Sequence, residues 1–243
     1  MYRRRKIKNI RHLGSGKTLT LTYLGWNNYY YKNRQVCSNY NLYGIPFTPI
    51  KSVEALRKMI PSETQTTEQL LAQKEVVFLG DELWRWIDAR TSAMDVSDKE
   101  KKQIKNKMVT DILSASRKAF VTVCFTSQTI DQVDRRIRSI TDFTVYPIIK
   151  GDNQEVEATV FLGPKPSAFN MERPIRFYCE PFMAMYNTYE RIPSLEEFGT
   201  EEEKSLPIET NPAWVKYLTG RKFNTQQITD YSIRMTEMLL KPQ

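Results

Sequence analysis

The sequence contains little cysteine and almost no histidine. Its 243 residues include three widely separated cysteines, with no C-x-x-C pair, and a single histidine, His12. Such cysteines encode neither a disulfide framework nor a thiolate metal cluster, which favours a reducing compartment. One histidine excludes a multi-histidine metal site and a serine–histidine hydrolase.

Long apolar runs are also absent. No stretch approaches the roughly 18 consecutive apolar residues that a membrane-spanning helix needs. The basic start, Met1 to Lys8, is like the beginning of a signal peptide, but no apolar segment follows it. We therefore expect a cytoplasmic protein without membrane insertion. The sequence shows neither an internal repeat nor a low-complexity tract.

The composition is that of an ordinary globular protein. Hydrophobic residues make up 40% of the chain, and 36 Lys and Arg outweigh 28 Asp and Glu to give a net charge of +8. The length allows one medium α/β domain with an appendage. Basic residues gather between Arg3 and Arg11 and acidic ones between Glu196 and Glu203. This asymmetry permits a polyanionic partner without establishing one.

The order of predicted elements indicates an α/β fold with a mainly parallel sheet, antiparallel edge strands and flanking helices. Buried strands separated by helices imply parallel crossovers, whereas Gly151 to Asn153 joins two later strands as a hairpin. We expect one α/β domain over residues 1–193 and an acidic linker with a helical C-terminal appendage over 194–243. The expected strands are 35–37, 75–79, 120–125, 141–149, 155–162 and 174–179, and the expected helices 19–32, one from 52, 97–115, 212–218 and 225–240.

Two of these interpretations involved a choice. Residues 19–32 fit both the alternation of a strand and the spacing of a helix, and the glycine-rich loop before them favours a helix. Residues 225–231 follow a helix and Gly220, which is compatible with a helix-turn-helix; a plain helical hairpin is the preferred interpretation.

The glycine-rich loop has the residue types of a phosphate-binding loop. Leu13-Gly-Ser-Gly-Lys-Thr-Leu19 offers backbone N–H groups at the start of a helix. Lys17 would contact the β- and γ-phosphates, and Thr18 would hold Mg²⁺. The full pattern has glycine where this chain has Arg11, and the segment before it is mostly polar. A chance glycine-rich turn is the alternative.

Two carboxylates follow the strand predicted at 75–79. Asp81 and Glu82 come 64 and 65 residues after Lys17, at the end of the sheet where α/β proteins bind ligands. Asp81 would complete the metal shell, and Glu82 would orient and deprotonate the attacking water. The alternative is a solvated acidic turn that ends a strand.

Gln128 and two arginines complete the candidate site. Gln128 follows the strand at 120–125 and would sense the γ-phosphate, although Thr126-Ser-Gln128 also suits a plain strand-ending turn. Arg136 and Arg138, in Asp134-Arg-Arg-Ile-Arg138, would act across a subunit boundary as arginine fingers. A solvated helix face is the alternative for these arginines.

Taken in order, these segments resemble the P-loop ATPases of the FtsK/HerA superfamily, in the branch of zonula occludens toxin-like (Zot-like) and archaeal-virus genome-packaging proteins. The resemblance covers residues 11–190. Its segments are Leu13 to Leu24, Cys37 to Leu42, Leu79 to Leu83 with Asp88 to Arg90, Ser116 to Lys118, Thr126 to Gln128, Asp134 to Arg138 and Tyr186 to Glu190.

The resemblance implies a RecA-like core with Walker A and B motifs that binds ATP and Mg²⁺. It implies a homo-oligomeric ring, with a hexamer as the expected size, that translocates double-stranded DNA independently of sequence, as in viral genome packaging. A capsid or portal-vertex protein would be a further partner, and host cytoplasm or virion the location. The alternatives are a Zot-like ATPase for virion assembly or extrusion, a nucleotide-dependent scaffold that does not move DNA, and a degenerate P-loop protein without turnover.

Overall fold

The fold is an α/β arrangement of two sheets around one central helix. The computed structural model describes residues 15–58, 74–83, 115, 120–128, 133, 135–151, 154–190 and 202–240. The predicted helix at 97–115, apart from Ala115, and the N-terminal basic segment fall outside these residues.

The larger sheet is mainly parallel. Its strand order is β4-β3-β1-β2-β8, in which the first four strands run parallel and β8 pairs antiparallel with β2. This confirms the predicted fold class. The strands are β1 (Gln35–Ser38), β2 (Pro46–Pro49), β3 (Val76–Gly80), β4 (Val121–Phe125) and β8 (Lys204–Ser205).

The sheet buries both of its faces. Val77 and Leu79 of β3 pack toward helix α1 (Lys17–Lys32), and Val76 and Phe78 pack on the opposite side. That second side is covered by side chains of α2 (Val53–Lys58) and α5 (Arg135–Ser139). All five residues of β3 are buried, as its continuous apolar sequence predicted.

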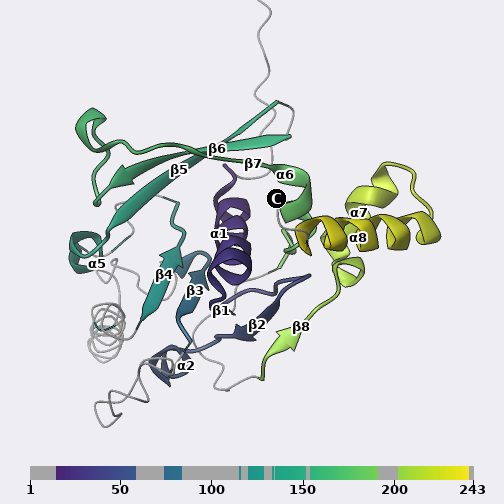
Figure 1. Ribbon diagram of the computed structural model, residues 1–243, viewed down its shortest axis with the longest axis horizontal. Helices are drawn as coiled ribbons and strands as arrows, with labels where there is room; N and C mark the ends of the chain where they lie inside the picture. Colours follow the sequence, from purple (N-terminus) through teal and green to yellow (C-terminus); the bar gives the residue numbers. More distant parts are fainter. Residues whose placement is uncertain are drawn as a thin grey trace, which may run out of the picture.

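A second, antiparallel sheet lies on the other side of α1. It consists of β5 (Phe143–Lys150), β6 (Glu155–Leu162) and β7 (Ile175–Tyr178), in that order. Figure 1 shows α1 between this sheet and the parallel one. The hairpin through Gly151 is confirmed, but these strands form their own sheet instead of the edges of the first. The antiparallel edge strand of the first sheet is β8.

The C-terminal part of the chain contacts the same central helix through α6 (Cys179–Met183) and α8 (Thr225–Leu240). Together with α7 (Pro212–Gly220), these helices lie to the right of α1 in Figure 1. The Trp26 indole nitrogen donates to the Leu239 carbonyl at 3.0 Å, and Trp214 and Leu218 join the same buried cluster as Leu19. The boundary between 193 and 194 stays a prediction.

Two strands differ from the sequence-based expectations. No strand is predicted between residue 37 and the helix that starts at 52, yet β2 occupies Pro46–Pro49. Proline is uncommon inside strands, so Pro46 and Pro49 concealed a strand that contains only two other residues. Strand β4 was expected to be buried, but Thr122 is exposed and Val123 half-buried, because among the described residues β4 pairs on one side only.

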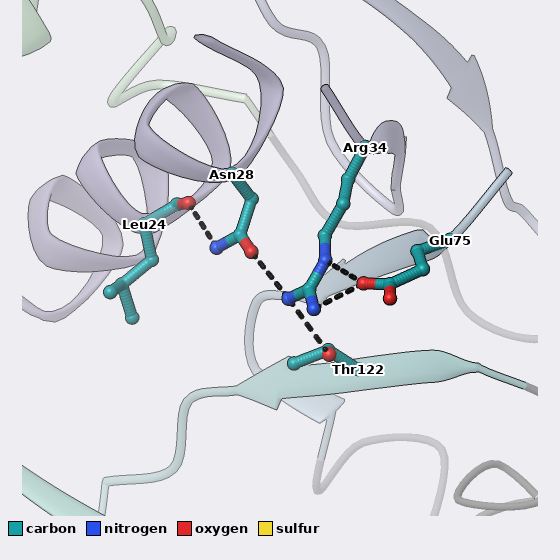
Figure 2. Close-up of polar contacts among 5 residues, drawn as sticks. All are labelled: Leu24, Asn28, Arg34, Glu75 and Thr122. Carbon is teal, nitrogen blue, oxygen red and sulfur yellow. Dashed lines mark hydrogen bonds and ion pairs between the residues drawn. The ribbon is translucent and has the colours of Figure 1, made fainter. Parts of the chain in front are cut away.

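A polar network joins α1 to the amino ends of the strands. Arg34 forms an ion pair with Glu75 and donates to Asn28 Oδ1 at 2.8 Å and to Thr122 Oγ1 at 3.3 Å (Figure 2). Asn28 Nδ2 in turn donates to the Leu24 carbonyl at 2.8 Å. This network lies at the end of the sheet away from Asp81 and therefore orients α1 without touching the candidate site. Within the described residues, no helix has the length and apolarity to cross a bilayer.

Candidate functional site

Gly16 and the start of α1 belong to the described part of the predicted phosphate loop. The helix begins at Lys17, and Gly16 precedes it at a φ of 82°. Thr20 donates to the Gly16 carbonyl from both its backbone nitrogen and its hydroxyl, each at 2.8 Å. The first N–H groups of the helix are therefore oriented toward the loop, as anion binding requires. Leu13 and Gly14 lie outside the described residues.

Lys17 and Thr18 are the first two residues of α1. The Lys17 ammonium donates to Ser15 Oγ at 3.0 Å. The Thr18 hydroxyl donates to Asp81 Oδ2 at 3.0 Å, although 63 residues separate the two. The expected metal ligands, Thr18 and Asp81, are therefore adjacent.

Asp81 is buried and held at every polar atom. Its Oδ1 accepts from the Thr126 hydroxyl at 2.6 Å, and its backbone N–H and carbonyl bond to the Asn39 side chain. Burial raises the pKa of the Asp81 carboxyl, while the hydrogen bonds from Thr126 and Thr18 oppose that rise. A carboxylate that is held in this way presents hard oxygen atoms to a cation.

Glu82 follows in an unusual backbone conformation. Its φ is 47°, in the left-handed region that residues other than glycine rarely adopt. Its backbone nitrogen donates to Thr126 Oγ1 at 2.8 Å. Because surrounding bonds must hold such a conformation in place, Glu82 has a defined position at the end of β3.

These groups surround one cavity of about 320 Å³. That volume lies at the lower end of the range typical of small-molecule sites. Glu82 and Gln128 both line it, so the ends of β3 and β4 and the start of α1 converge as predicted. The lining residues from the predicted set are Ser15, Gly16, Lys17, Thr18, Leu19, Asp81, Glu82 and Gln128.

Several further residues, for which the sequence predicts no role, also line the cavity. Tyr40, Tyr186, Asn187, Thr188 and Glu190 line the cavity. Burial raises the pKa of Tyr40 well above its usual value and also raises that of Tyr186, where the Asp81 charge adds to the effect. Both phenols therefore stay neutral hydrogen-bonding groups at physiological pH. The segments 37–42 and 186–190 were noticed only through the family resemblance.

Glu190 is the third carboxylate of this cavity. Both of its oxygens accept from the Asn41 backbone nitrogen at 3.1 Å. Burial raises the pKa of the Glu190 carboxyl, and the bond from Asn41 partly opposes that rise. Glu190 lines the same cavity as Asp81, Glu82 and Lys17, so the cavity carries three carboxylates and one ammonium group.

The two predicted arginines do not join this cavity. Arg136 and Arg138 lie on α5, with Arg136 exposed and Arg138 half-buried, and neither side chain lines the space around Lys17. The structure describes a single chain, so their predicted action across a subunit boundary is not tested by it. That role stays a prediction.

The residues present fit a magnesium–nucleotide complex. Thr18 and Asp81 offer a hydroxyl and a carboxylate oxygen 3.0 Å apart. Among the described residues, no cluster of three or more histidine, cysteine or acidic side chains has the geometry of a metal site by itself. Mg²⁺ is commonly bound through one or two protein ligands together with phosphate oxygens, which is the arrangement that this pair allows.

Comparisons with known proteins give one structural similarity to report. No protein-family model matches the chain, and no curated protein matches it. The crystal structure of the N-terminal domain of zonular occludens toxin from Neisseria meningitidis superposes with a TM-score of 0.45 and 14% sequence identity. The alignment covers 72% of this chain and 94% of that domain.

Proposed function

We propose that this protein is a Mg²⁺-dependent nucleoside triphosphatase of the P-loop type, with ATP as its substrate. The observation that carries the proposal is the contact between Thr18 and Asp81, which places a strand-end carboxylate at the first turn of a helix that follows a glycine loop. Phosphate loops use this juxtaposition to bind a nucleotide together with its cation.

Each residue then has a defined task. The N–H groups after Gly16 and the Lys17 ammonium bind phosphate oxygens, and Thr18 and Asp81 hold Mg²⁺, which neutralises charge that develops on the phosphates. Glu82 accepts the proton of the attacking water, because it is a carboxylate held at the end of β3 beside the same cavity. Gln128 contacts the γ-phosphate or the water from the end of β4.

The test is ATP hydrolysis by the purified chain with and without Mg²⁺. Turnover that disappears in Glu82→Gln while ATP binding persists supports the assignment. Lys17→Ala should lose binding as well as turnover. Wild-type protein that neither binds nor hydrolyses ATP would contradict the assignment. Measuring ATP binding by Arg11→Gly beside the wild type would show whether Arg11 weakens nucleotide binding, as in a degenerate loop.

The work that the hydrolysis drives is a separate proposal, which rests on the family resemblance. In the first version, a ring of subunits translocates double-stranded DNA, with Arg136 or Arg138 completing a neighbour's site. In the second, the ATPase acts in virion assembly or extrusion, which is the alternative that the resemblance to Zot-like proteins implies.

One experiment separates these two versions. DNA stimulation of the ATPase, together with binding that weakens steeply with salt and ignores sequence, favours translocation. ATPase activity that is indifferent to DNA and responds to a coat or portal protein favours assembly.

A further inference from the structure

The Asn39 side chain forms a reciprocal pair of hydrogen bonds with the backbone of Asp81. Asn39 Nδ2 donates to the Asp81 carbonyl at 2.8 Å, and the Asp81 nitrogen donates to Asn39 Oδ1 at 2.7 Å. Asn39 is only 4% exposed, so water does not compete for these bonds. It does not line the cavity, and thus it touches neither nucleotide nor metal.

This pair extends the parallel sheet beyond the ends of its strands. Strands β1 and β3 are neighbours whose register ends at Ser38 opposite Leu79, and the Asn39 nitrogen donates to the Leu79 carbonyl at 3.1 Å. One step further, the chain turns away after β1, and the Asn39 carboxamide takes the place of a backbone partner. The buried polar groups of Asp81 are therefore satisfied where no strand is left to pair with them.

Both hydrogen bonds from the Asn39 side chain reach the backbone of Asp81, so together they fix the orientation of Asp81. A planar carboxamide that engages the N–H and the carbonyl of Asp81 together restrains φ and ψ of that residue, and so the direction of its side chain. The Thr126 hydroxyl restrains the turn from the β4 side, through Asp81 Oδ1 and the Glu82 nitrogen. The two carboxylates are thus held from both strands that flank β3.

We propose that Asn39 is a positioning residue for the phosphoryl transfer: it holds the turn after β3 so that Asp81 faces the metal and Glu82 faces the attacking water. This proposal rests on the proposed function. The left-handed φ of Glu82 makes the restraint necessary, because a non-glycine residue keeps that conformation only when its neighbours hold it.

The test measures turnover and affinity separately in Asn39→Ala. We expect kcat to fall about 10- to 100-fold, the range found when groups that orient metal ligands are removed. The KM for ATP should stay at the wild-type value, because no hydrogen bond links Asn39 to the described loop residues, Ser15 to Lys17. Circular dichroism at the assay temperature establishes that the variant is folded.

Asn28→Ala is the matched control for a purely structural effect. Asn28 is likewise buried, at 6% exposure, and its side chain donates to a backbone carbonyl, but it lies at the end of the sheet away from the cavity. The Asn28→Ala variant should lose stability while keeping the wild-type kcat.

Asn39→Asp replaces the alanine variant in this test if Asn39→Ala does not fold. Aspartate keeps the shape of the side chain and one acceptor, but it turns the donor into an oxygen that faces the Asp81 carbonyl.

The possible results are distinct. A lower kcat with unchanged KM in the Asn39 variants, and a normal kcat in Asn28→Ala, supports the proposal. A folded Asn39→Ala or Asn39→Asp protein with wild-type kcat overturns it and leaves the ATPase assignment intact. A wild-type chain without ATPase activity overturns the proposed function, and the role of Asn39 falls with it.

Discussion

Replacing Gly16 by alanine tests the phosphate loop through its backbone. Gly16 has a φ of 82°, and a Cβ atom there would lie 3.1 Å from Ile149 Cγ1 and 3.7 Å from Pro147 Cβ, both on β5. An L-residue in the left-handed region costs about 1–2 kcal/mol. The tight contact with Ile149 adds about 1 kcal/mol, at the low end of overpacking costs. Alanine also reduces the conformational entropy of the unfolded chain, which offsets about 0.4–1 kcal/mol of this loss in stability.

The net expectation for Gly16→Ala is a loss of about 2 kcal/mol in the free energy of unfolding. Two other glycines separate the contributions. Gly151→Ala meets no atom within 4 Å but has a φ of 58°, so it carries the conformational cost alone. Gly220→Ala has open space and no positive φ, so we expect it to be neutral or slightly stabilising.

Urea unfolding and ATP titration together complete this test. Gly16→Ala should be the least stable of the three variants and should bind ATP more weakly, because the N–H groups that follow Gly16 shift with it. The other two variants should bind ATP like the wild type. If Gly16→Ala is as stable as Gly220→Ala and binds ATP normally, the close approach of the loop to β5 has no energetic consequence and the reasoning is wrong.

Three further predictions concern other parts of the fold. Thr126→Val removes the hydroxyl between Asp81 and the Glu82 nitrogen, so we expect a stability loss of about 3 kcal/mol and slower ATP turnover, whereas Thr126→Ser should lose about 1 kcal/mol and keep activity. Burial raises the pKa of the Cys37 thiol from 9.0 to about 12. As the pH rises, the unfolded chain therefore loses the Cys37 proton before the folded chain does. The free energy of unfolding should fall above pH 9 by about 1.4 kcal/mol per pH unit, and less steeply in Cys37→Ala. Equal slopes for the two proteins in urea unfolding at alkaline pH would contradict this. Arg34→Met breaks the network with Glu75 and should cost about 1 kcal/mol in thermal unfolding without changing ATPase activity.

Local sequence determined most of the secondary structure. The helix predicted over 19–32, because a glycine-rich loop precedes it, is observed as Lys17–Lys32. The strand predicted over 75–79, because its compact apolar run suits burial on both faces, is observed as Val76–Gly80. Helix α8 occupies the predicted residues 225–240. Strand β2 was not predicted, because two of its four residues are prolines, which are uncommon inside strands, and the other two are too few to show an alternating pattern.

The sequence also predicted which residues form the candidate site, because the order of lysine, threonine and two carboxylates is typical of phosphate and cation binding. Only the tertiary structure showed that Thr18 and Asp81 are in contact across 63 residues and that Asn39 and Thr126 hold the turn between Asp81 and Glu82. Residue type and local spacing are properties of the chain, so they could be read from it. The partners of a strand-end turn depend on which strands lie beside it, and that is decided by the order of strands in the sheet.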